Sequence, residues 1–189
     1  MIIASQNLTN FDISLPEDTI YRINLAWVDN LSTLESILKK HRDREIFLDL
    51  PRNRTKPPNN KYSIEELEPI LENFKNIKFL AISNVDSDED LKPFLQIIPE
   101  NCIIIPKIES PLGVENIENI TSKLGTKKII MLDHDDLYSS LLKMGKNTEK
   151  FQTYIKILSE FCSKNQVTLL RTIGVLFGDH EKRISEYIK

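Results

Sequence analysis

The chain has 189 residues, a length that suits one domain with a single hydrophobic core. Hydrophobic residues make up 40% of it and charged residues 28%, as in an ordinary globular protein. The formal net charge of −3 gives no electrostatic basis for nucleic-acid binding. No apolar run is long enough to span a membrane or to act as a signal peptide. We therefore expect a cytoplasmic protein in which Cys102 and Cys162 are buried free thiols, with a disulfide as the alternative.

Short apolar, β-branched runs alternate along the chain with longer amphipathic runs. The short runs predict strands, and most of them are apolar throughout, as expected where both faces of a sheet are covered. In chain order, the predicted strands are Ile2–Ala4, Ile20–Asn24, Ile46–Leu50, Lys78–Ile82, Cys102–Pro106, Ile129–Leu132 and Val167–Arg171.

Helix patterns separate these strands, and several begin at recognisable capping residues. A Ser or Thr followed three residues later by Glu forms a capping box, which satisfies two backbone N–H groups at a helix start. The predicted helices begin near Ser32 (with Glu35), Ser63 (with Glu66), Ser87, Val114 and Thr148, and the fourth ends at Gly125.

Repeated strand–helix units predict an α/β fold with a parallel sheet. Both an open doubly wound sheet and a β/α barrel satisfy this pattern, but no glycine-rich phosphate-binding motif follows any strand. We therefore predict a single domain over residues 1–189, a truncated or incomplete (β/α)8 TIM barrel. Either Ile173–Phe177 supplies an eighth strand irregularly, or the barrel stays open. An open sheet edge would favour a homo-oligomer.

Functional groups of a parallel barrel lie at the carboxyl ends of its strands. Carboxylates from two strands, surrounded by cations, predict a Mg²⁺ or Mn²⁺ site that also receives an anion. The polar residues at these positions are Arg22, Asn24, Asp49, Arg52, Arg54, Ser83, Asn84, Lys107, Glu109, Asp133–Asp136, Arg171 and Thr172.

Each of these residues also has a structural interpretation. The run Asp133–Asp136 could cap a following helix. Lys107 and Glu109 lie on the same side of a strand and could form a simple surface ion pair. His134 could be an ordinary loop residue, and Trp27 could serve in packing or as a pocket wall. The functional interpretation therefore rests on the residues as a set.

One stretch of the sequence begins Lys107-Ile108-Glu109 and ends Gly113-Val114-Glu115-Asn116-Ile117. This stretch is the most specific match in a resemblance of the sequence to the catalytic barrel of pyruvate kinases. Further similar segments follow in the same order over roughly residues 20–175, and they are Tyr21–Asn24, Ile46–Thr55, Phe79–Leu91, Ile103–Ile120, Ile130–Leu137 and Val167–Thr172. The resemblance implies a barrel of the phosphoenolpyruvate/pyruvate type.

The resemblance implies roles for individual residues. Glu109 and Asp136 would be the ligands of Mg²⁺ or Mn²⁺, and Lys107 would be the cation beside the reacting phosphoryl or enolate oxygen. Arg22 would contact phosphate or the opposite side of the substrate, and either Arg22 or Arg171 could stabilise the developing enolate. Thr172 would help to handle the enol proton.

Three further residues are assigned to substrate binding on the same resemblance. Asn24 would contact phosphate or the opposite side of the substrate. Asp49 stands where the family has a cation-site aspartate, and Ser83 ends the matching fourth strand. The substrate would be a small oxo-acid or an enolpyruvate, with no nucleic acid or membrane as partner.

The sequence also departs from this family. A nucleotide-covering lid domain is replaced by Thr55–Tyr62, and the C-terminal regulatory domain has no counterpart. Two glycines that flank the family's metal-binding aspartate are Asp135 and Tyr138 here, where they could repel or crowd a substrate carboxylate. Loss of the lid argues against ATP synthesis. We expect a Mg²⁺-dependent lyase, aldolase or other enolate enzyme; the alternative is a catalytically degenerate barrel that binds a metabolite or a protein.

Overall fold

In the part of the chain that the structure describes, seven parallel strands form one curved sheet, and their order in space is their order in the chain. The computed structural model describes residues 3–5, 16–53, 58, 60–145 and 147–171. Within these ranges the strands are β1 (Ile3–Ser5), β2 (Ile20–Asn24), β3 (Ile46–Leu50), β4 (Ile77–Ile82), β5 (Ile103–Ile108), β6 (Ile129–Leu132) and β7 (Thr168–Arg171). Every neighbouring pair is parallel.

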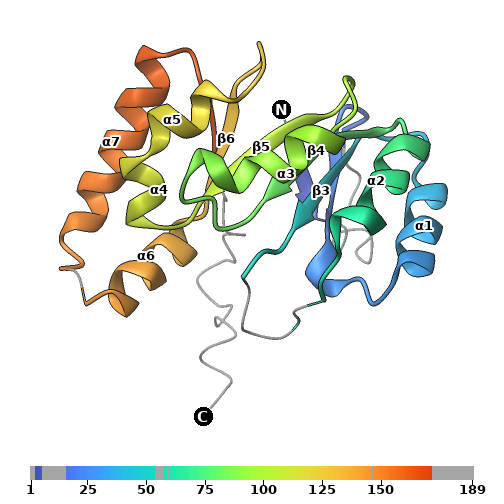
Figure 1. Ribbon diagram of the computed structural model, residues 1–189, viewed down its shortest axis with the longest axis horizontal. Coiled ribbons are helices and arrows are strands. Elements are labelled where there is room, and N and C mark those ends of the chain that lie inside the picture. Colours follow the sequence, from blue (N-terminus) through green and yellow to red (C-terminus); the bar gives the residue numbers. More distant parts are fainter. Residues whose placement is uncertain (1–2, 6–15, 54–57, 59, 146, 172–189) are drawn as a thin grey trace.

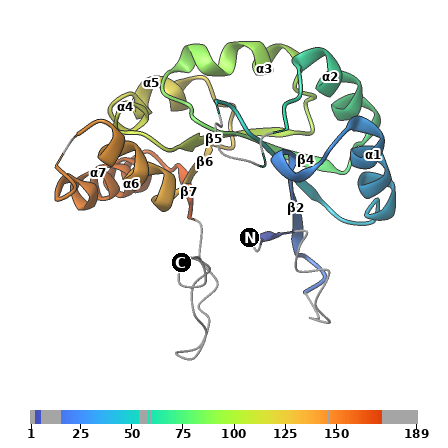
Figure 2. The ribbon, with the colours of Figure 1, turned by 90° about the horizontal axis from the view of Figure 1, so that it is seen from below.

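The sheet is a half-barrel. Over the ranges given above, β1 and β7 do not pair with each other, and the strands form an arch (Figure 2). The predicted α/β fold with a parallel sheet is confirmed, and the open arch is consistent with a truncated barrel. The possible eighth strand, Ile173–Phe177, lies outside the described residues.

Helices cover the outer, convex side of this arch (Figures 1 and 2). The α-helices are α1 (Leu31–Lys40), α2 (Ile64–Asn73), α3 (Lys92–Ile97), α4 (Pro111–Glu115), α5 (Ile117–Ser122), α6 (His134–Lys143) and α7 (Lys150–Lys164). Two 3₁₀ turns, η2 (Leu25–Trp27) and η3 (Asp88–Leu91), follow β2 and β4. In the described part of the chain, no helix combines the length and the apolar character needed to cross a membrane.

Two apolar clusters lie on opposite faces of the sheet. The outer cluster packs between sheet and helices, and includes Leu48 and Leu80. The inner cluster lies on the concave side and includes Phe47 and Phe79. Adjacent residues of one strand thus belong to different clusters, because successive side chains point to opposite faces. This explains why the strands are apolar throughout instead of alternating.

Several predicted element bounds are corrected by the structure. The capping box of Ser63 and Glu66 is confirmed at α2. In contrast, α1 is capped by Asn30, whose side chain accepts a hydrogen bond from the Thr33 nitrogen, and not by Ser32. The helix predicted over Val114–Leu124 starts earlier, at Pro111, and divides at Asn116 into α4 and α5.

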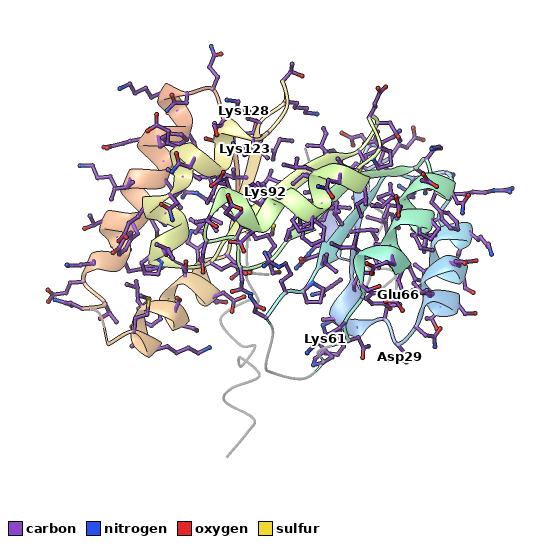
Figure 3. The ribbon with its side chains drawn as sticks, in the orientation of Figure 1. Asp29, Lys61, Glu66, Lys92, Lys123 and Lys128 are labelled. Carbon is purple, nitrogen blue, oxygen red and sulfur yellow. The ribbon has the colours of Figure 1, made fainter. Side chains whose placement is uncertain are left out.

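Lys92 and Lys123, both labelled in Figure 3, are exposed side chains of the helical layer. Lys92 pairs with Glu89 at 2.5 Å and Lys123 with Asp88 at 3.6 Å. Such exposed pairs contribute little to stability. Cys102 and Cys162 are buried free thiols, as predicted.

Candidate metal centre

The polar residues of the site continue the inner face of the sheet beyond its apolar cluster. Side chains two residues apart on a strand share a face. Ile105 lies in the inner cluster, so Lys107 and Glu109 follow it on the same side. Asp49 follows Phe47 in the same way on β3. Strand β5 extends to Ile108, beyond the predicted end at Pro106, and Lys107 is therefore a strand residue.

A buried ionic network connects β2, β3 and β5. Arg22 donates to Oδ2 of Asp49 through both Nε, at 2.9 Å, and Nη2. Nζ of Lys107 lies 3.4 Å from Oδ1 of Asp49 and 2.8 Å from Oε1 of Glu109. It also donates to Oγ of Ser83 at 3.1 Å. Asp49, Lys107 and Glu109 are at most 5% exposed, so solvent screens these charges weakly.

The network determines the ionisation of its members. Burial raises the pKa of Asp49, but the charges of Lys107 and Arg22 outweigh it and hold that pKa below its ordinary value. Burial lowers the pKa of Lys107, but Asp49 and Glu109 outweigh it and keep the ammonium charged. Burial raises the pKa of Glu109; Lys107 offsets this in part, and the carboxyl of Asp136 adds to the increase.

Asn84 holds one oxygen of Glu109. Its backbone nitrogen donates to Oε2 of Glu109 at 2.7 Å. Asn84 has a φ of 53°, in the left-handed region, and its Nδ2 donates to the carbonyl oxygen of Arg52 at 2.6 Å. The turn after β4 thus connects the turn after β3 to the carboxylate at the end of β5.

Three carboxylates converge beside this network. One oxygen from each of Glu109, Asp133 and Asp136 lies within 4.8 Å of the others. Asp133 also caps α6, because its Oδ1 accepts from the Asp136 nitrogen at 3.2 Å. Hard carboxylate oxygens are the ligands that Mg²⁺ and Mn²⁺ prefer. The cluster therefore fits such an ion, with Glu109 buried, Asp133 half-buried and Asp136 exposed.

A cavity of about 160 Å³ opens next to the three carboxylates. It is lined by the turns after β3 and β4, by Glu109 at the end of β5, and by one side of α6. Its lining residues are Pro51, Arg52, Asn53, Ser83, Asn84, Glu109, Asp136, Ser139, Ser140 and Lys143. The site thus lies at the carboxyl ends of the parallel strands, where ligands of β/α barrels bind.

Six of the eight predicted site residues fall into two groups in the structure. Ser83, Glu109 and Asp136 line the cavity. Arg22, Asp49 and Lys107 form the buried network behind it. Asn24 accepts a hydrogen bond from the Ala26 nitrogen at 3.0 Å and caps η2. Thr172 lies outside the described residues.

Asp133 and Asn84 were among the polar residues predicted at the strand ends, but the sequence singled out neither as a metal ligand nor as a residue that positions one. Met131 lies on the inner face of β6, and Asp133 follows it by two residues. This spacing was the signal for Asp133. Asn84 had no such signal. Its role depends on a left-handed backbone conformation, which asparagine adopts more readily than most residues but does not always adopt.

Comparisons with known proteins show resemblance at the level of the fold. No protein-family model and no curated protein matches the chain. Among solved structures, RipC from Yersinia pestis matches with a TM-score of 0.60 and 15% identity, over 85% of this chain and 72% of that chain. A pyruvate kinase from Cryptosporidium parvum, in complex with ADP, matches with a TM-score of 0.57 and 14% identity, over 79% of this chain and 50% of that chain.

An HpcH/HpaI aldolase/citrate lyase family protein from Burkholderia cenocepacia gives a third match. Its TM-score is 0.57 at 14% identity, over 82% of this chain and 71% of that chain. The chain spans only half of the pyruvate kinase, and at these identities the likeness shows the fold alone. The fold is thus similar to that of pyruvate kinase and of an aldolase/citrate lyase family protein, in agreement with the resemblance in sequence.

Proposed function

We propose that this chain is a Mg²⁺- or Mn²⁺-dependent enzyme of the lyase or aldolase type, acting on a small oxo-acid or enolpyruvate substrate through an enolate. In this proposal the half-barrel is a truncated (β/α)8 barrel of the phosphoenolpyruvate/pyruvate type. The observation that carries it is the convergence of Glu109, Asp133 and Asp136 within 4.8 Å beside a polar cavity. This cavity lies at the end of the sheet where barrel enzymes carry their active sites.

Glu109, Asp133 and Asp136 would hold the cation. When bound, a divalent cation supplies Lewis-acid polarisation of the substrate's keto oxygen and adjacent carboxylate. Oε2 of Glu109 is oriented by the Asn84 nitrogen, so the carboxylate is held in place before a ligand arrives. Preorganisation of this kind removes part of the cost of ordering the site on binding.

Lys107 would stabilise negative charge that develops on the substrate. Its ammonium stays protonated because Asp49 and Glu109 raise its pKa, and Ser83 accepts one of its hydrogen bonds. A buried cation is effective in this role, since few water molecules screen it. Arg22 would act mainly through Asp49, by fixing the carboxylate that orients Lys107.

The proposed reaction does not include phosphoryl transfer to a nucleotide. Only residues 51–63 connect β3 to α2, where pyruvate kinases insert a nucleotide-covering lid domain. Transfer of a phosphoryl group requires both phosphates to be held and water to be excluded. A short connection of this kind favours chemistry on the oxo-acid itself.

The second candidate is a catalytically degenerate barrel that binds a metabolite or a protein. Asp135 and Tyr138, in place of glycines, favour it. However, neither side chain is among the described residues that line the cavity. The ring of Tyr138 packs edge-on against Phe151 at 5.4 Å between centroids, on the α7 side of α6. This arrangement favours the enzyme over the degenerate barrel.

The metal site is tested by thermal unfolding with Mg²⁺ or Mn²⁺ and millimolar pyruvate or oxalate. We expect the metal and ligand together to raise the Tm, since they bind only the folded state. Glu109→Gln should abolish the increase. Asp133→Asn should weaken it without loss of helix capping, because asparagine caps as well as aspartate. Asp135→Asn is the matched control on the exposed side of α6 and should behave as wild type.

The outcomes separate the two candidates. An unchanged Tm with both metals would contradict the metal site, and an increase retained in Glu109→Gln would mean that the ligands are assigned wrongly. If the metal binds, release of pyruvate from candidate oxo-acids distinguishes a lyase from a binding module. Loss of that release in Glu109→Gln would assign it to this site.

We also propose that the protein is a cytoplasmic homo-oligomer. The support is the pair of outer strands, β1 and β7, which have no second partner strand within the described ranges. Unpaired strand edges favour association. Sedimentation equilibrium should give a mass above the 21.9 kDa of one chain; a monomer at micromolar concentration would contradict the proposal.

A further inference from the structure

Helix α6 presents three different sides. Leu137 and Leu141 are buried against the outer core. Tyr138 and Leu142 are exposed. The third side lines the cavity with a stripe of polar residues at positions i, i+3, i+4 and i+7, which share one face of a helix. This stripe consists of Asp136, Ser139, Ser140 and Lys143.

Besides Lys143, a second cation lines the cavity, and it is Arg52 in the turn after β3. Nη2 of Arg52 pairs with Oδ1 of Asp90 at 3.0 Å, which holds the guanidinium. The carbonyl oxygen of Arg52 accepts from Nδ2 of Asn84 at 2.6 Å, which holds the backbone. A guanidinium is always charged.

The described lining of the cavity favours a polar occupant. Apart from Pro51, each lining residue that the structure describes is charged or carries a hydrogen-bonding side chain. Its volume of about 160 Å³ suits a small molecule. A short, polar occupant therefore fits this cavity best.

The charges of the cavity are separated along α6. Asp136, a candidate metal ligand, and Lys143 are seven residues apart, which is about 10 Å along a helix axis. The carboxylates Glu109 and Asp136 would be neutralised by a divalent cation, whereas Lys143 would remain positively charged. Arg52 pairs with Asp90 through Nη2, but its Nη1 has no hydrogen-bond partner among the described residues. A substrate held at the metal by its oxo-acid end could reach these cations with its other end.

We infer that Arg52, Lys143 and the α6 serines form a subsite for a second anionic group of the substrate. The substrate class is then a short oxo-acid or enol ester that carries a second carboxylate or a phosphate in addition to its first carboxylate. This inference rests on the proposed function, because the metal site defines where the first carboxylate binds.

The two cations differ in what else they do. Arg52 connects the turn after β3 to η3 through Asp90, so its substitution also affects folding. Lys143 lies at the exposed end of α6, and its removal leaves that connection intact. Lys143→Gln is therefore the decisive variant. Lys156→Gln, on the exposed side of α7, is its matched control.

Calorimetric titration of the full chain in Mn²⁺ tests the subsite with two matched pairs of probes. The first pair is 2-oxoglutarate and 2-oxopentanoate, which differ only in the terminal carboxylate. The second pair is phosphoenolpyruvate and 2-methoxyacrylate, which share the enol frame and differ in that a methyl group replaces the phosphoryl group. We expect one doubly anionic probe to bind about tenfold more tightly than its partner, as a charge-assisted contact provides. The pair that shows the preference identifies the second group as carboxylate or phosphate.

Lys143→Gln should reduce this preference by roughly threefold or more while leaving the affinity for the singly charged probe unchanged. Lys156→Gln should keep the full preference. Equal affinities within both pairs, or a preference unchanged in Lys143→Gln, would overturn the subsite while leaving the metal site intact. If Mn²⁺ and the probes do not bind at all, the inference fails together with the proposed function.

Discussion

The backbone nitrogen of Asn84 donates a 2.7 Å hydrogen bond to Oε2 of Glu109, and this contact joins the ends of β4 and β5. The contact depends on a left-handed backbone at Asn84, with a φ of 53°. A conformation of this kind costs about 1–3 kcal/mol in a non-glycine residue and persists only where its surroundings hold it. Here the side chain of Asn84 is held by the carbonyl oxygen of Arg52.

Two substitutions of Asn84 should distinguish the effect of its backbone conformation from the effect of its side chain. Asn84→Gly keeps the left-handed conformation available, so Mn²⁺ affinity should stay close to wild type. Asn84→Val strongly disfavours that conformation, and both stability and Mn²⁺ affinity should fall. Titration calorimetry and urea unfolding measure the two effects.

The control for this pair is Gln166→Val. Gln166 also has a left-handed φ, of 56°, but lies between α7 and β7, away from the cavity. Its substitution should reduce stability without changing Mn²⁺ affinity. Wild-type Mn²⁺ affinity in Asn84→Val would show that Asn84 does not position Glu109.

Removal of the charge on Asp49 should destabilise the fold strongly. Asp49 is 2% exposed and contacts both Arg22 and Lys107. Asp49→Asn leaves these cations without their carboxylate, which typically costs about 3–5 kcal/mol for a buried pair. Urea unfolding at pH 7 measures the loss. Asp43→Asn, on the exposed segment after α1, should change stability by less than about 0.5 kcal/mol.

The effect of Asp49→Asn should also depend on pH. The folded-state pKa of Asp49 lies below its ordinary value of 3.8, so its ionised form stabilises the fold. That contribution is present above the unfolded-state pKa and is lost as the pH falls through the folded-state pKa. The stability gap between wild type and Asp49→Asn should therefore be constant from pH 7 to about 5 and narrow below 3.8. A gap that widens toward acid pH would contradict the network.

Substitution by alanine should affect the stability of the fold differently at two glycines. A Cβ on Gly113 in α4 would lie 2.6 Å from the carbonyl oxygen of Val85, which follows β4. Because a backbone atom cannot move aside easily, Gly113→Ala should cost about 1–3 kcal/mol. Gly125 has no atom within 4 Å of such a Cβ, and Gly125→Ala should be neutral or slightly stabilising. Thermal unfolding of both variants tests the close packing of α4 on the β4 turn.

Much of this architecture could be predicted from local patterns. Apolar runs located all seven strands to within a few residues, and the capping box at Ser63 marked the start of α2. The two-residue period of a strand put Lys107 and Glu109 on one face. By contrast, the start of α1 was misplaced, because Asn30 and Ser32 both precede the helix pattern and either residue type can cap.

The sequence by itself determined the alternation of strands and helices, the polar residues at the strand ends and the resemblance to a pyruvate kinase barrel. Only the tertiary structure decided which of these residues meet. Strand register and sheet curvature bring Asp49 between Arg22 and Lys107, and they bring Asp133 and Asp136 beside Glu109. The physical reason is range: periodicity and capping act over a few residues, whereas Arg22 reaches Asp49 across 27 positions of the chain through the packing of a whole sheet.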